Sequence, residues 1–213
     1  MERKKSLTGK ASVTLIILFH AVGLAGFFIP MLNPLFIKLV PYHLLLMLVV
    51  IMYSYSRVSV RITGFLASAW LMGFCCEYIG VHTGWLFGHY NYGDTLGPQL
   101  SGIPFIIGIN WFLLIFSTGA FMQRTKFRKP VMRIVTGAAI LTLLDILIEP
   151  VAAKLDYWHW DSSIVPLKNY ACWFLISVIM LWGFELFRFR RLNYAGPVLL
   201  LVQFIFFLAL QWL

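Results

Sequence analysis

Three carboxylic acids stand within apolar stretches of the sequence, where a charged group is costly. Asp145 and Glu149 are four residues apart, so they share one face of a helix. Glu77 lies near the end of another apolar stretch, at a similar expected depth. A carboxylate at the centre of a bilayer costs about 2.5–3.5 kcal/mol on insertion scales, and such residues usually face the interior and have a function. We expect the three to converge and to repel one another, so that at least one stays protonated and can act as a general acid.

Aromatic and amide side chains accompany these carboxylates in the sequence. Such rings are typical of an interfacial belt, but they also suit a wall around a long apolar molecule and can stabilise a carbocation. The residues expected to bind such a molecule are Tyr90, Tyr92, Trp111, Trp158, Trp160 and Trp173, the amides of Asn110 and Asn169, and the imidazoles of His82 and His89.

The spacings that would indicate other chemistry are missing from the sequence. The histidines form no His-x-x-His, His-x-x-x-His or His-Glu-x-x-His pattern, and no glycine-rich phosphate loop or paired-aspartate diphosphate motif is present. We therefore expect neither a metal nor a cofactor. His20 and His43 stand alone in apolar stretches, and we expect them to be hydrogen-bonded interior residues.

Seven apolar stretches position these residues, each close to the roughly 20 residues that cross a bilayer. With 61% hydrophobic and only 12% charged residues, the 213-residue chain cannot be a soluble globular or a disordered protein. A transmembrane β-barrel is disfavoured because the apolar runs do not alternate. We predict an all-α polytopic membrane protein with one integral membrane domain over residues 1–213. The expected spans are 11–29, 35–55, 62–80, 103–122, 131–150, 169–187 and 194–212.

The basic residues predict how the chain is oriented. With seven spans, 14 of the 17 lysines and arginines fall on the side of the N-terminus, which places that side in the cytoplasm. This asymmetry accounts for the net charge of +9, so we expect no nucleic-acid binding. The two longest loops, 81–102 and 151–168, then lie on the other side with most of the acidic residues. We expect a multi-pass protein of the inner membrane, with an active site toward the outer, periplasmic half.

An internal repeat is suggested by the order of residues in two segments. In each, a carboxylate ends a span, an aromatic-x-aromatic motif follows in the loop, and a proline opens the next span, which contains an asparagine and Trp-Phe-Leu. Pro104 and Pro166 are separated by 62 residues, as are Trp111 and Trp173. We predict two related helical hairpins, made by spans three and four and by spans five and six.

Two blocks of motifs within residues 73–188 carry a family resemblance. The first is Glu77-x-x-Gly80, Thr83-Gly84, Phe87-Gly88-x-Tyr90-x-Tyr92, Gly102-Ile103-Pro104 and Trp111. The second is Asp145-x-x-x-Glu149-Pro150, Trp158-x-Trp160, Pro166-x-x-Asn169-Tyr170 and Trp173-Phe174. With this ordered set the sequence resembles the carotenoid biosynthesis family of CruF-type carotenoid 1,2-hydratases, which includes bisanhydrobacterioruberin hydratases.

The resemblance implies a hydro-lyase that adds water across the terminal 1,2 double bond of lycopene, γ-carotene or a C50 precursor, giving a tertiary alcohol. Its partners would be the carotenoid, membrane lipid and other enzymes of the carotenoid pathway. Hydration needs an acid to protonate the alkene and a base to orient and deprotonate water, and it needs no cofactor. Our hypothesis makes Asp145 the acid, Glu149 the base or water-holder, and Glu77 the partner of the acid or an alternate acid.

Two other functions remain compatible with the same carboxylates. An isomerase similar to lycopene cyclases would begin with the same protonation but would exclude water. A small membrane transporter would use acidic residues along a path through the bilayer, whereas the acids here gather toward one side.

Overall fold

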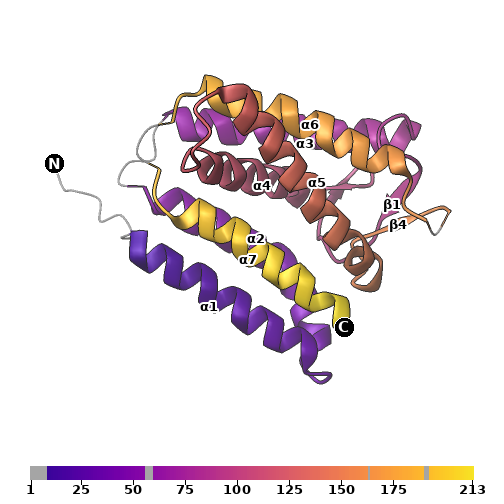
Figure 1. Cartoon of the computed structure of the whole chain (residues 1–213). Helices are drawn as coiled ribbons and strands as arrows, with labels where there is room; N and C mark the ends of the chain where they lie inside the picture. The colour runs from indigo at the N-terminus through magenta and orange to yellow at the C-terminus, as the bar shows by residue number, and fades with distance from the viewer. Residues whose placement is uncertain (1–8, 56–59, 163, 190–191) are drawn as a thin grey trace.

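The computed structural model describes residues 9–55, 60–162, 164–189 and 192–213, and within these ranges the chain is a bundle of helices (Figure 1). Each predicted apolar stretch forms one helix. The helices are α1 (Gly9–Phe28), α2 (Asn33–Tyr53), α3 (Val60–Thr83), α4 (Ile106–Met122), α5 (Pro130–Lys154), α6 (Leu167–Leu186) and α7 (Ala195–Ala209), which continues into the short 3-10 helix η1 (Leu210–Trp212). Four short strands lie in the loops: β1 (Tyr90–Tyr92), β2 (Gln99–Leu100), β3 (Ile103–Pro104) and β4 (Trp158–Trp160).

The lengths and composition of these helices are those of a helical membrane protein. In the described ranges, six helices are long and apolar enough to cross a bilayer, with α7 counted together with η1. The remaining helix, α4, has 17 residues and is apolar but shorter. Of those 17 residues 14 are buried, and α4 packs against α2, α3, α5, α6 and α7. Helix α4 is therefore the centre of the bundle, surrounded by the longer helices.

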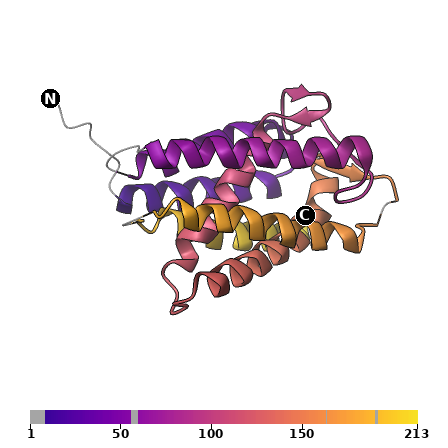
Figure 2. The same cartoon turned by 90° about the horizontal axis from the view of Figure 1, so that it is seen from above.

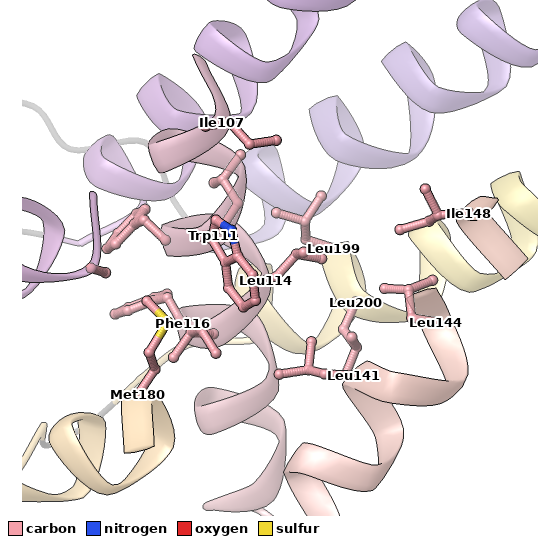
Figure 3. Packing of buried hydrophobic residues seen from close by; sticks show 14 of the residues in the cluster. Ile107, Trp111, Leu114, Phe116, Leu141, Leu144, Ile148, Met180, Leu199 and Leu200 are labelled. Atoms are coloured by element: carbon pink, nitrogen blue, oxygen red, sulfur yellow. The ribbon is translucent and has the colours of Figure 1, made fainter. Parts of the chain in front are cut away.

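The core is built around α4 by large apolar side chains. Figure 3 shows Trp111, Leu114 and Phe116 of α4 lying among side chains from the neighbouring helices, including Leu141 of α5 and Leu199 of α7. Leu141 and Leu199 are completely buried. This packing holds α4 and α5, which both contribute to the site described below, in fixed relative positions.

Most helix boundaries differ by a few residues from the sequence prediction, and two of these differences have a structural cause. The fourth span was expected to begin at residue 103, but Ile103 and Pro104 form β3 and pair with Gln99 and Leu100 of β2, so the helix begins at Ile106. The fifth span was expected to end at Pro150, but α5 continues to Lys154. Proline interrupts the backbone hydrogen bonds of a helix without necessarily ending it in membrane proteins, where neighbouring groups compensate for the lost bond.

The two ends of the bundle differ in character. The start of α1 at Gly9 lies at one end, whereas the C-terminus, β1 and β4 lie at the other (Figure 1, Figure 2). We call this second end the strand end. The turns on the N-terminal side carry basic residues such as Arg124, Lys126 and Arg128, between α4 and α5. The strand end carries the long aromatic loops.

Candidate functional site

Glu77 is held near the strand end of α3 by three hydrogen bonds. The Tyr90 and Tyr92 hydroxyls donate to its Oε2 over 2.5 and 2.7 Å, and the Trp111 indole N–H donates to its Oε1 over 2.9 Å. The Glu77 side chain is buried, at 5% exposure. Burial, together with the nearby Glu77, raises the pKa of Tyr90 and of Tyr92 well above the usual value for tyrosine. Both hydroxyls therefore keep their protons and remain donors to the carboxylate.

Glu149 has a similar environment made by the other half of the chain. The indole N–H groups of Trp158 and Trp160 donate to its Oε2 over 3.0 and 2.8 Å. The Asn169 side-chain amide donates to Glu149 Oε1 over 3.1 Å. All three partners donate, so the Glu149 carboxyl accepts three hydrogen bonds in this structure.

Asp145 lies one helical turn from Glu149 and is connected to it through Asn169. The same Asn169 nitrogen donates to Asp145 Oδ2 over 2.8 Å. Asp145 is completely buried, and in the part of the chain that the structure describes its Oδ1 has no hydrogen-bond partner. The expected placement of Asp145 and Glu149 on one helix face is thus seen, with one amide between them.

The aromatic donors are positioned by a pair of short strands. Strands β1 and β4 run antiparallel, with Tyr90 opposite Trp160 and Tyr92 opposite Trp158. Alternate residues of a strand point to the same side, so both aromatic residues of each strand reach the carboxylate of their own hairpin. Trp111 of α4 also stacks on Trp173 of α6, with ring centroids 4.3 Å apart. The two segments aligned in the sequence therefore meet face to face in the fold.

Between the two glutamates lies a small cavity of about 20 Å³, which we call the polar chamber. This volume is just sufficient for one water molecule. Most of the residues proposed from the sequence line it. The lining consists of Glu77, Phe87, Tyr90, Tyr92, Ile107, Asn110, Trp111, Ile148, Glu149, Trp158, Trp160, Asn169 and Trp173.

A larger cavity of about 340 Å³, which we call the apolar cavity, adjoins the polar chamber. The two share four wall residues, namely Ile107, Asn110, Ile148 and Trp158. The rest of its wall comes mainly from α1, α2 and α7. Phe19, Leu39 and Tyr42 belong to this wall and are exposed on the surface, so the cavity reaches the outside of the bundle at α1 and α2.

Several residues lie elsewhere than the sequence suggested. His82 belongs to the last turn of α3, where it stacks on Tyr78 and bonds its carbonyl, and His89 is exposed beside Gly84. Neither histidine lines the chamber or the apolar cavity. Asp145 is also absent from the chamber wall, because it lies one turn deeper in α5 than Glu149.

The structure also brings in residues that the sequence analysis did not select. Phe87 lines the chamber with a positive φ of 62°, for which no local sequence signal exists. Ile107 and Ile148 separate the two cavities, and both could have been found as neighbours of Asn110 and Glu149 on their helices.

None of the histidines has a hydrogen bond to the three buried carboxylates in the described part of the chain. His20 is buried and bonds both the Ile16 carbonyl and His43, as expected for interior histidines. His159 points away from the chamber and bonds Asp156. Within the described ranges, no three side chains of His, Cys, Asp or Glu are placed to hold a metal ion.

Comparison with known proteins gives two matches in sequence and none in structure. The chain is 29% identical over 148 residues to a bisanhydrobacterioruberin hydratase from Haloarcula japonica, an alignment that covers 63% of this chain and 50% of the relative. The chain thus spans about half the length of that curated relative. No solved structure matches it. The sequence profile described as carotenoid biosynthesis protein matches residues 38–212, which is most of the chain. The chain therefore belongs to the carotenoid biosynthesis protein family.

Proposed function

We propose that this protein is a carotenoid hydratase, which adds water across the terminal 1,2 double bond of an acyclic carotenoid end to give a tertiary alcohol. The observation that carries the proposal is the junction of the two cavities. A chamber of about 20 Å³ between two glutamates suits one water, and it adjoins an apolar cavity of about 340 Å³ that suits the end of an isoprenoid chain. Water and alkene would meet at the shared wall.

The supply of hydrogen bonds suggests which carboxyl carries the proton. Glu77 and Glu149 each accept three hydrogen bonds, an environment that favours a carboxylate. Asp145 accepts one hydrogen bond, and its buried Oδ1 has no hydrogen-bond partner among the described residues. Burying an oxygen without a partner costs less free energy for a neutral carboxyl than for a carboxylate anion. We therefore assign the stored proton to the Asp145–Glu149 pair, in which the Asn169 amide touches both members.

The chamber wall then decides which atoms meet the substrate. Glu149 lines the chamber whereas Asp145 does not, so Glu149 delivers the proton that the pair holds. Glu77 faces the same chamber with Tyr90 and Tyr92, and it holds the water and accepts its proton. This assignment keeps the three residues expected from the sequence but exchanges the parts given to Glu77 and Glu149.

The reaction balances without any other reactant. Glu149 protonates C2 of the terminal alkene, which forms a C–H bond and leaves a tertiary cation at C1. The water oxygen attacks C1 while Glu77 takes one of its protons. The return of that proton to the Asp145–Glu149 pair, through water in the chamber, completes the cycle with one water added and none of the groups consumed.

Aromatic rings on several sides of the chamber suit the cationic intermediate. Trp111, Trp158, Trp160 and Trp173 line the chamber together with the two tyrosines. The face of an aromatic ring attracts a cation by about 2 kcal/mol or more when water is excluded. The same rings exclude bulk water, so that only the chamber water can capture the cation.

We further propose that all seven helices span the inner membrane with the N-terminus in the cytoplasm. The basic turns support this orientation, which would place the chamber toward the periplasmic side. The exposed edge of the apolar cavity at α1 and α2 would then face lipid, the medium in which a carotenoid dissolves.

The test is to express the chain in a bacterium engineered to make lycopene or γ-carotene and to analyse the pigments by chromatography and mass spectrometry. A pigment heavier by one water, with an unchanged chromophore, is expected. It should be lost in Glu77→Gln and retained in Asp161→Asn, a matched change at an exposed carboxylate near the strand end. An isomer of unchanged mass would favour a cyclase instead. No new pigment from lycopene, γ-carotene or a C50 precursor would contradict the proposal.

A further inference from the structure

Asn110 lies where the polar chamber and the apolar cavity meet. The two cavities share four wall residues, of which two are isoleucines and one is Trp158, whose indole N–H is already bonded to Glu149. The fourth is Asn110, with an amide that can both donate and accept. We infer that Asn110 holds the attacking water together with Glu77, and so decides whether the carbocation is captured by water or loses a proton. The inference rests on the proposed function, to which it adds the residue that selects hydration.

The helical positions around Asn110 show which way its side chain faces. Ile107, Asn110 and Leu114 are spaced by three and four residues, so they share one face of α4. All three line the apolar cavity. Trp111, the next residue, lies about 100° further around the helix, and its indole N–H reaches Glu77. Asn110 also lines the chamber, so it borders the water site and the apolar cavity at once.

The amide of Asn110 is available to a bound molecule. Among the residues that the structure describes, none forms a hydrogen bond with this side chain, and both of its polar atoms keep some accessible surface. Asn169, the other amide of the chamber, is by contrast bonded to Asp145 and Glu149. A polar group without a partner is costly within a bilayer, and a leucine would fill the position without that cost. The partner that Asn110 lacks is therefore expected among the molecules that occupy the cavities.

Two acceptors can fix the orientation of one water molecule. One hydrogen of the water points to the Glu77 carboxylate, which takes it up in the reaction, and the other points to the Asn110 amide oxygen. A lone pair of the water oxygen is then left for C1 of the cation in the apolar cavity. As the C–O bond forms, the oxygen becomes positively charged, so both hydrogen bonds strengthen in the transition state and favour capture by water.

Without the Asn110 amide the cation follows another course. In Asn110→Leu the acid pair still protonates C2, but the tertiary cation then loses a proton from C2 or from a methyl group on C1. The first course regenerates the alkene and the second moves the double bond, and in both the proton goes to Glu149 or Glu77 with no water added. In heavy water the group delivered to C2 is a deuteron. A deuterium therefore stays in the unhydrated carotenoid whenever a hydrogen leaves in its place.

Deuterium uptake measures both courses in one sample. Membranes are isolated from bacteria that express the full chain and make lycopene, γ-carotene or a C50 precursor, and they are then incubated in buffered heavy water. Mass spectrometry of the extracted pigments gives the ratio of hydrated to unhydrated carotenoid among the deuterated molecules, so pigment made before the transfer does not count. The matched control is Asn91→Leu, the same change at an exposed position of β1 that points away from the chamber.

We expect Asn110→Leu to lower this ratio about 10- to 100-fold, as expected for a hydrogen bond to a charged group, while deuterium uptake continues. Asn91→Leu should leave the ratio unchanged. An unchanged ratio in Asn110→Leu would overturn the inference. Loss of both deuterated pigments together would also overturn it, because Asn110 would then serve the protonation step or the fold instead of the water.

The outcomes also separate this inference from the proposed function. If the unmodified protein adds water and Asn110→Leu gives the same ratio, only the role of Asn110 is refuted. If the unmodified protein adds water to none of the three carotenoids, the proposed function is refuted and the inference with it.

Discussion

Replacing each chamber glutamate by glutamine should affect the stability of the fold very differently. In Glu77→Gln the new amide can keep its oxygen toward the Trp111 N–H and turn its nitrogen toward the two tyrosine hydroxyls. Hydroxyls rotate and can accept as well as donate, so both amide hydrogens find a partner, and the hydroxyl hydrogens can turn toward a water in the adjoining chamber. The polar contacts of this site are therefore retained, although the base is lost.

In Glu149→Gln no such arrangement exists. The partners of Glu149 are two indole N–H groups and one amide N–H, which here all donate. Wherever the new nitrogen is placed, it faces at least one donor, and at least one buried group loses its hydrogen bond. An unsatisfied buried donor costs about 1–3 kcal/mol. For a chain of this size each kcal/mol lowers the melting temperature by about 2–4 °C, so the expected loss is about 2–12 °C.

The assay is thermal unfolding of the purified variants in one detergent, followed by the loss of monodisperse protein on size-exclusion chromatography. Glu77→Gln should melt close to the unmodified protein and close to the exposed control Asp161→Asn. Both glutamine variants should lose hydration activity by at least about 100-fold, as expected when a general acid or base is removed. Equal melting temperatures for Glu77→Gln and Glu149→Gln would refute the reasoning from donor-only partners.

Three further predictions concern neighbouring features. Asn169→Leu removes both amide contacts of the acid pair and should reduce the rate of hydration more than it changes substrate binding, as measured by kcat and KM separately; an effect on KM alone would contradict the acid-pair assignment. Gly73→Ala places a Cβ 2.6 Å from the Trp111 ring, and it should lower the melting temperature and the activity together; an unaffected variant would show that the helices separate at no cost. Hydrogen bonds from His159 and from the backbone hold the pKa of Asp156 below its usual value, so its contribution to loop stability is present at neutral pH and is lost as the pH falls through that lowered pKa. The backbone amides of residues 93–95 should lose their protection against hydrogen exchange, measured relative to the intrinsic rate at each pH, only below about pH 4. Loss of protection already at pH 6 would contradict the role of the Asp156 carboxylate.

The helices and the gathering of the carboxylates could be predicted because the membrane restricts the alternatives. An apolar run of sufficient length has to be helical in lipid, where every backbone group needs a partner within its own segment. Glu77 and Glu149 could be placed in the interior for a similar reason, since exposure to lipid is costly. Trp111 and Trp173, which the sequence analysis paired by their common spacing, stack on each other in the fold.

Other features depend on contacts that leave no pattern in the sequence. The pairing of β1 with β4 involves only three residues of each strand, too few for an alternating signal. Asp145 differs from Glu149 by one helical turn, and only the packing around α5 shows that it lies below the chamber wall. The apolar cavity itself arises where α7 packs near α1 and α2, from which it is far apart in the sequence.

The central position of α4 has a consequence for how the chain is assembled during synthesis. Helix α4 emerges before α5, α6 and α7, three of the five helices that surround it. Until α5, α6 and α7 are inserted, the faces of α4 that these helices will cover remain in contact with lipid. Lipid is as apolar as those faces, so this contact imposes no penalty. Helix α1 also packs against α7, so this part of its packing surface forms only after α7 is inserted. The earliest and the innermost helix thus both depend on the last one, so a ribosome that stalls before α7 would release a chain whose helices are inserted but whose bundle cannot close.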